Sequence, residues 1–257
     1  MSDAIPVFSS ASPRVRQVPV DRAWTWLAAG WNDILGAPHV SLAYGALLVA
    51  ISVALTFGLW LLGWIYLLLP LAAGFMFVAP VLAIGLYETS RRLAAGEPTS
   101  LGAAIAGGRT NRTQIALMGL ILMLFNLAWV RIATLLFALF FNDVNPGLER
   151  LLQWTLFSAA SLPFLMVGTA IGAALAVIVF AISAVSLPLL VDRDENVFTA
   201  IATSVTAVQV NWRAMALWAA LIVVFTGLGI ATFFLGLAIT LPLIGHATWH
   251  AYKDLVE

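Results

Sequence analysis

The fold of this chain is decided by the stretch Asn211–Leu241, NWRAMALWAALIVVFTGLGIATFFLGLAITL, because an earlier stretch resembles it. The earlier stretch is Asn111–Phe141, NRTQIALMGLILMLFNLAWVRIATLLFALFF. Both begin with Asn at a polar boundary, continue with Ala-Leu, and contain Ile-Ala-Thr deep in an apolar run. Each is long enough to cross the roughly 30 Å hydrocarbon core of a bilayer as a helix. Two related spans predict a duplicated membrane domain.

The composition excludes a water-soluble globule. Of the 257 residues, 62% are hydrophobic and 9% are charged, and the mean hydropathy is +1.02, whereas soluble domains carry about 25% charged residues. The apolar runs are continuous and do not alternate. Because only helices or closed barrels satisfy the backbone inside lipid, continuous runs indicate helices. We therefore expect an all-α polytopic membrane protein whose main contact is the lipid bilayer.

Charge and cysteine content exclude further classes. The formal net charge is zero, so nothing suggests a nucleic-acid partner. The chain has no Cys, which excludes disulfides, thiolate catalysis, iron–sulfur clusters and thiolate metal sites.

The N-terminal region divides into a tail and a helix. Residues 1–19 are rich in Ser, Pro and Ala and lack the apolar segment of a signal peptide, which predicts a disordered cytoplasmic tail before one membrane domain, 20–257. Over 21–36, apolar residues recur at helical spacing. They are Trp24, Leu27, Ala28, Trp31 and Leu35. Two interpretations stay open: a helix lying in the membrane interface, or a helix packed on the domain's own cytoplasmic face.

Five spans are expected in the membrane domain. They cover about 41–62, 65–87, 113–141, 156–191 and 213–241, and an amphipathic segment, 242–257, follows them. Pro70 and Pro80 predict kinks in the second span. A break at Gly227/Gly229 would divide the last span and give six. The unbroken match with 113–141 favours five, which places the C-terminus on the side opposite to the N-terminus.

The basic residues predict the orientation. Arg residues precede the first span and lie in the links 88–112 and 192–213, whereas the loop 142–153 has one Arg and two acids. The positive-inside rule therefore places the N-terminus and both links in the cytoplasm. With this orientation the second and third spans match the fourth and fifth in the same direction, which is a parallel repeat and not an inverted one. Chance similarity between apolar helices remains the alternative.

The most tempting chemical pair is His246 and His250. Their spacing of four places both imidazoles on one helix face, where they could ligate a metal or haem. No carboxylate or third His accompanies them on that turn, and HExxH is absent. Lys253 and Glu257 extend the same face into a polar stripe, which favours an amphipathic helix end among the headgroups. We therefore expect no metal site and no cofactor.

Four other polar positions are functional candidates. Arg131 lies roughly 27 Å along its helix, so snorkelling to the outer headgroups is favoured over a buried substrate or partner contact. Asn126 is expected to form an interhelical hydrogen bond. Asn211 and Arg213 lie at the cytoplasmic entrance of the last span, where we expect any recognition to occur.

Enzyme chemistry has no visible carrier. The sequence contains no phosphate-binding GxxxxGK[ST], no GxSxG and no paired catalytic carboxylates. We predict no catalytic residue and a protein that is not an enzyme.

Four stretches together resemble a known family. They are VPVDRAWTWLAAGWNDI (18–34), VAPVLAIGLYETSRRL (78–93), FAISAVSLPLLVDRD (180–194) and PLIGHATWHAYKDLV (242–256). They resemble a bacterial family of predicted integral membrane proteins classed as a domain of unknown function, over nearly the whole chain from Val18 to Glu257. The resemblance implies the inner membrane of a bacterium. Some members carry a label resembling cytochrome c oxidase subunit I, which three His residues do not support.

Three functional hypotheses follow. The first is a non-enzymatic scaffold or assembly factor that contacts other inner-membrane proteins, because Gly- and Ala-rich helices suit close packing. The second is a transporter or channel for a small or lipidic substrate, with kinked Pro helices as moving parts. The third is haem or metal binding through His246 and His250.

Overall fold

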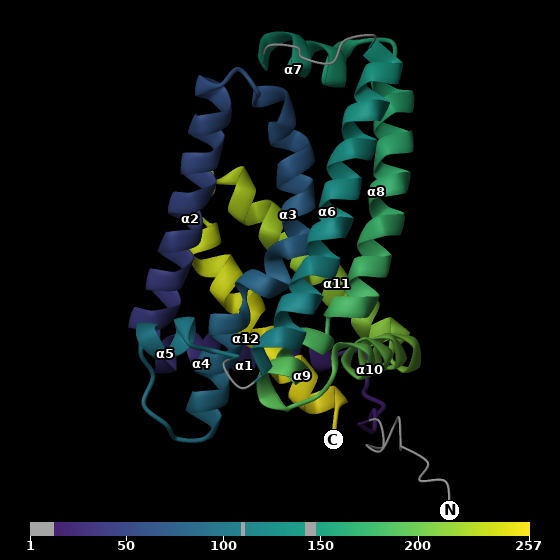
Figure 1. The fold of residues 1–257 in the computed structure, drawn as a ribbon. Coiled ribbons are helices and arrows are strands. Elements are labelled where there is room, and N and C mark those ends of the chain that lie inside the picture. Colours follow the sequence, from purple (N-terminus) through teal and green to yellow (C-terminus); the bar gives the residue numbers. More distant parts are fainter. Residues whose placement is uncertain (1–12, 109–110, 142–147) are drawn as a thin grey trace, which may run out of the picture.

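The computed structural model describes residues 13–108, 111–141 and 148–257, which form a bundle of helices (Figure 1). The elements in chain order are α1 (Arg22–Gly36), α2 (Pro38–Leu61), η1 (Ile65–Leu67), α3 (Leu68–Leu82), α4 (Ile84–Ala94), α5 (Leu101–Ile105), α6 (Arg112–Phe141), α7 (Leu148–Phe157), α8 (Ser161–Ser183), α9 (Ser186–Asp192), α10 (Val197–Val210), α11 (Trp212–Ala231) and α12 (Leu237–Leu255).

In the described part of the chain, five helical segments are long and apolar enough to cross a membrane. They are Pro38–Leu61, Ile65–Ala94, Arg112–Phe141, Ser161–Asp192 and Trp212–Ala231. Their outer faces are rich in exposed aliphatic side chains, which are stable only in contact with lipid. The prediction of an all-α polytopic membrane protein is confirmed.

The short helices gather at one end of the bundle. Helices α1, α4, α5, α9 and α10 lie there together with both described chain ends, while α7 and the α2–η1 turn lie at the opposite end (Figure 1). We call the first of these the polar end, defined by residues 13–41, 84–108, 186–211 and 246–257.

Two of the spanning segments are interrupted near the polar end. α3 ends at Leu82, two residues beyond the intrahelical Pro80, and α4 begins at Ile84. The second segment is divided between Ser183, where α8 ends, and Ser186, where α9 begins. Pro80 has no N–H to donate to the Met76 carbonyl, and the helix breaks three residues later at Ala83, where the Tyr44 hydroxyl donates to the Leu82 carbonyl. The second expected kink does not form, because Pro70 lies in the first turn of α3, where no helical acceptor is lost.

The expected single span 213–241 is wrong. α11 ends at Ala231, and α12 begins at Leu237 and packs back against α11. Between them Phe233 and Phe234 have φ of 54° and 68°, a left-handed conformation that ends a helix. α12 returns to the polar end, so the C-terminus lies beside residues 13–19 and not at the opposite end (Figure 1).

Both chain ends are more ordered than expected. Residues 13–19 are not a disordered tail, because Val15 bridges Val256 and the Arg16 amide donates to the Leu255 carbonyl at 2.8 Å. Residues 1–12 lie outside the described residues. The segment 242–257 is not an amphipathic surface helix either. His246 and Tyr252 in α12 are fully buried against α1, α2, α4 and α11.

Helix α1 packs on the domain's own polar end. It buries Ala23, Trp26, Leu27, Gly30 and Ile34, chiefly against α12. A Cβ on Gly30 would lie 2.7 Å from the Ala247 amide nitrogen, so only Gly permits this approach. The predicted apolar stripe therefore divides, because Leu27 is buried while its other members remain exposed. We call these, Trp24, Ala28, Trp31 and Leu35, the α1 stripe.

The two predicted repeats share their order of elements. α3–α4, α5 and α6 follow one another as α8–α9, α10 and α11 do, and each connecting helix begins at a capping side chain, Ser100 or Asn196. Asn111 and Asn211 are both buried and both donate to backbone carbonyls. The second copy differs in its last helix, which is shorter and is followed by α12.

Candidate functional site

A buried polar network joins four helices at the polar end. His246 of α12 lies between Ser41 of α2 (Nε2 to Oγ 2.9 Å) and Ser90 of α4 (Nδ1 to Oγ 2.7 Å). The Ser90 hydroxyl donates to Asp33 Oδ2 of α1 at 2.6 Å. His250, one turn further along α12, also contacts Asp33 Oδ2, at 2.8 Å. The network closes one end of the bundle.

One arrangement of hydrogens satisfies the network when Asp33 is ionised. Ser90 has one hydroxyl proton and donates it to Asp33. In its contact with His246, Ser90 must therefore accept the hydrogen bond, and Nδ1–H donates. Nε2 of His246 then accepts from the Ser41 hydroxyl, and His250 Nε2–H donates to Asp33. This assignment is inferred from the donor and acceptor count.

The network leaves no free imidazole nitrogen at His246. Both nitrogens form hydrogen bonds to serine hydroxyls, and burial lowers the pKa of His246 to about 4, although the charge of Asp33 opposes this shift. Asp33 is bonded to His250 and lies 3.9 Å from His246 Nδ1, so a carboxylate and not an open space lies between the two imidazoles. Among the described residues no group of three or more metal-ligating side chains occurs.

Ion pairs fix the surroundings of this network. Asp254 accepts two hydrogen bonds from Arg22 at 2.8 Å each and one from the Trp26 indole at 2.9 Å. Burial opposes ionisation of Asp254, but these hydrogen bonds outweigh it and the pKa of Asp254 is lowered. Asp192 accepts from Tyr252 and Lys253, which ties α9 to α12.

The four polar candidates have different environments. Asn211 is buried and joins the N-terminal segment, because it accepts from the Val18 amide and donates to the Arg16 carbonyl. Arg213 is exposed and its guanidinium lies over the Trp212 ring at 5.2 Å. Arg131 is exposed on α6 and has no ion pair among the described residues. Asn126 does not form the expected interhelical hydrogen bond, because its buried Oδ1 has no partner.

An apolar cavity of about 470 Å³ lies between η1, α3, α6, α7 and α8 in the half of the bundle away from the polar end. We call it the outer cavity. Its wall includes the small residues Gly168, Gly172 and Ala133, and the Trp129 ring lies against Gly172. Leu69, Leu165 and Val223 line it and are also exposed on the membrane-facing surface, so the cavity opens towards lipid.

Among the described residues that line the outer cavity, one buried side-chain oxygen has no hydrogen-bond partner. Thr155 of α7 is 5% exposed, and its hydroxyl oxygen has no hydrogen-bond partner. Thr134 in the same wall donates to the Val130 carbonyl at 2.8 Å. A buried hydroxyl without a partner costs free energy, so a ligand atom bonded to Thr155 would supply a missing bond.

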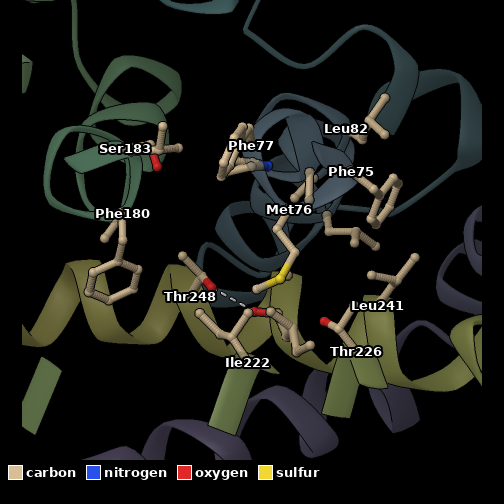
Figure 2. A pocket seen from close by; sticks show the side chains of 18 of the residues that line it. Phe75, Met76, Phe77, Leu82, Phe180, Ser183, Ile222, Thr226, Leu241 and Thr248 are labelled. Atoms are coloured by element: carbon tan, nitrogen blue, oxygen red, sulfur yellow. Dashed lines mark hydrogen bonds between the residues drawn. The ribbon is translucent and has the colours of Figure 1, made fainter. Parts of the chain in front are cut away.

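A second apolar cavity, of about 110 Å³, lies nearer the polar end between α3, α8, α11 and α12 (Figure 2). We call it the inner cavity. Apolar side chains such as Phe75, Phe180 and Ile222 surround it, with the hydroxyls of Ser183, Thr226 and Thr248 (Figure 2). The Thr248 hydroxyl donates a hydrogen bond to the Ile244 carbonyl at 2.7 Å. No charged residue lines either cavity in the described part of the chain.

These features define a polytopic α-helical membrane protein with apolar internal cavities. A family model described as a predicted integral membrane protein (DUF2189) matches residues 68–192, slightly less than half of the chain. The match runs from α3 to α9, and over these residues it confirms the resemblance to a family of predicted integral membrane proteins. It is shorter than the expected likeness over Val18–Glu257. Comparisons with curated proteins and with solved structures give no match.

Sequence reasoning missed most of these positions. Asp33, Ser41 and Ser90 carried no signal, because each lies in an ordinary helical pattern and becomes a partner of His246 or His250 only in the folded chain. The cavities were also missed, since Gly and Ala in apolar helices suggest close packing as readily as open space. Helical spacing correctly placed His246 and His250 on one face, but that face is buried.

Proposed function

We propose that this protein is a non-enzymatic membrane protein that binds an uncharged, lipidic molecule in the outer cavity. The main support for this proposal is the cavity itself. It has the size and the mainly apolar wall of a ligand pocket, and it opens towards lipid. This proposal develops the hypothesis of a carrier for a small or lipidic substrate. A charged solute is disfavoured, because its charge would lose its hydration in an uncharged apolar cavity without compensation.

Filling the outer cavity tests the proposal. A Cβ added at Gly168 would meet no atom within 4 Å, so Gly168→Leu places a side chain in the cavity without a backbone clash. Gly227 in α11 has the same free space but lines neither cavity, which makes Gly227→Leu the matched control. Both variants and the wild type would be purified in mild detergent, and their bound lipids identified by native mass spectrometry and extraction.

The expected result is a retained neutral lipid in the wild type and in Gly227→Leu, reduced at least about tenfold in Gly168→Leu, since a filled cavity excludes its ligand. Equal lipid content in all three proteins would contradict binding in this cavity.

We propose further that the polar end faces the cytoplasm of a bacterium and that the spans lie in its inner membrane. Arg16, Arg22, Arg91, Arg193 and Lys253 belong to this end, and basic residues concentrate on the cytoplasmic side of membrane proteins. Cysteines introduced one at a time at Glu97 and Phe157 test the orientation, because the chain has no native Cys. An impermeant maleimide added to intact cells should label only the Phe157→Cys variant.

A second proposal is the scaffold or assembly-factor role, which the α1 stripe favours. Two Trp and one Leu remain exposed at the polar end although α1 is packed on its other face. Aromatic residues are enriched in protein interfaces and also in the membrane interface. The Trp24→Ser/Trp31→Ser variant should lose a partner protein that co-purifies with the wild type. Unchanged co-purification would leave lipid headgroups as the contact of this stripe.

A further inference from the structure

The outer and inner cavities share one wall. Met76 and Phe77 of α3 and Ala176 of α8 line both. The outer cavity lies among helix ends away from the polar end, and the inner cavity lies nearer to it. The two are therefore stacked along the long axis of the bundle, with these three residues between them.

We propose that the two cavities form one site for a long-chain lipid with a single uncharged hydrogen-bonding head group, and that Met76 is the movable partition between them. This inference rests on the proposed function, because it assigns the ligand class and its course beyond the outer cavity. The head group lies at Thr155, and the chain runs past Met76 to the region between Ile222 and Thr248.

Met76 is the wall residue that can move. Phe77 is held, because it is almost fully buried and makes an edge-on contact with Trp129 at 6.5 Å between ring centroids. Ala176 has no rotatable side chain. The Met76 side chain is unbranched and flexible, and Figure 2 shows it extending from α3 towards Ile222 and Thr248 across the inner cavity. A rotamer change at Met76 alone would connect the two spaces.

Thr155 and the uncharged cavity walls indicate the chemistry of the ligand's head group. Thr155 lines the outer cavity, and its buried hydroxyl has no partner among the described residues, so rotation of this side chain towards the cavity would let it bond to a ligand hydroxyl or carbonyl. No charged side chain lines either cavity in the described residues, so a phosphate or carboxylate head would be left uncompensated. A fatty alcohol fits both conditions, because it combines one neutral hydroxyl with a hydrocarbon chain.

Photolabelling with two alcohols tests the course of the chain. The probes are octanol and hexadecanol, each with a diazirine at the end of the chain away from the hydroxyl, added to purified full-length protein in nanodiscs. The octanol probe should label outer-cavity residues such as Leu165 and Thr169. The hexadecanol probe should label inner-cavity residues such as Ile222 and Thr226, because only its longer chain passes Met76.

Variants at the partition and the head site sharpen the test. Met76→Phe should lower inner-cavity labelling by hexadecanol at least about fivefold and leave octanol labelling unchanged. Met123→Phe is the control, since Met123 is exposed on α6 and lines neither cavity. Thr155→Val should weaken binding of both probes about five- to tenfold, the usual effect of one lost hydrogen bond. Thr134→Val, whose hydroxyl already has a partner, should not.

The outcomes separate the two proposals. Octanol labelling of the outer cavity with no hexadecanol labelling of α11 or α12 would overturn the joined site and leave the proposed function standing. Inner-cavity labelling that Met76→Phe does not reduce would overturn the role of Met76. Labelling of neither cavity by either probe would overturn the proposed function itself. Unchanged helical circular dichroism in every variant establishes that a lost signal is not a loss of folding.

Discussion

The polar end and the cavity-bearing half of the bundle satisfy their buried polar groups differently. At the polar end, Asp33, Ser41, Ser90 and His246 are hydrogen-bonded to one another across four helices. In the described residues, the buried side-chain atoms without a partner all lie elsewhere, on Asn126, Thr155 and Thr240. A satisfied buried network makes its helices rigid, whereas apolar space and an orphan hydroxyl leave room for a ligand. One end therefore fixes the fold, and the other half can accommodate a guest.

The largest effect is expected from breaking the polar network at its shared acceptor. Asp33→Ala leaves Ser90 and His250 without their common acceptor and removes the carboxylate beside His246, which should cost about 3 kcal/mol of unfolding free energy. Asp194→Ala, at an exposed position of the same end, is the control and should change stability by less than about 0.5 kcal/mol. Unfolding in detergent micelles, followed by circular dichroism, measures both. Similar losses in the two variants would contradict a special role for the network.

Acidification should loosen the same end. The pKa of His246 is about 4 in the folded chain against 6.5 for an unperturbed His, so between these values the unfolded chain binds more protons than the folded one. Stability should therefore fall as pH drops from about 6.5 to about 4, by up to about 3 kcal/mol, and the contribution should flatten below that.

The pH effect is isolated by comparing His246→Gln with the exposed His39→Gln. The His246→Gln variant should lose most of this pH dependence, and His39→Gln should keep it. Equal pH profiles for the wild type and His246→Gln would show that other groups cause the acid response.

The Arg22–Asp254 pair should matter less than the network. Both side chains are partly exposed, so solvent screens the pair, although its two hydrogen bonds are well aligned. Asp254→Asn should lower stability by about 1 kcal/mol. It should also increase proteolysis after Arg14 or Arg16, because the backbone of residues 255–257, which is hydrogen-bonded to Arg14 and Arg16, follows Asp254 directly. Unchanged proteolysis would mean that the bridge to Val256 holds this segment without the ion pair.

The smallest change in stability is expected in the outer cavity, where one substitution should stabilise the protein instead of destabilising it. Thr155→Val removes an unpartnered buried hydroxyl and should leave the empty protein equally stable or stabilise it by up to about 1 kcal/mol. Thr134→Val removes a satisfied hydroxyl and should lower stability by about 0.5 kcal/mol. Both are measured by thermal unfolding in lipid-free detergent. A clear destabilisation by Thr155→Val would assign that hydroxyl a structural bond and remove it as a ligand contact.

Particular residues show where sequence reasoning stopped. The helices and the spans of α2, α3 and α6 followed from hydropathy, and the two Asn residues that the sequence places at matching positions, 111 and 211, are both buried and both donate to backbone carbonyls. The turn at Phe233–Phe234 was not seen, because two Phe in an apolar run favour continuation of the helix. The burial of His246 was missed because the stripe His246, His250, Lys253 and Glu257 describes one helix, and its partners lie on three others.

The sequence by itself determined that this is a helical membrane protein, because composition and hydropathy act within single segments and lipid leaves the backbone few alternatives. The tertiary structure alone decided the return of α12, the polar network and the cavities. Ser41 and His246 are 205 positions apart, and Ser90 and His246 are 156 apart. No local pattern encodes such a pairing, and a cavity is defined only by how the surrounding helices fail to fill the space between them.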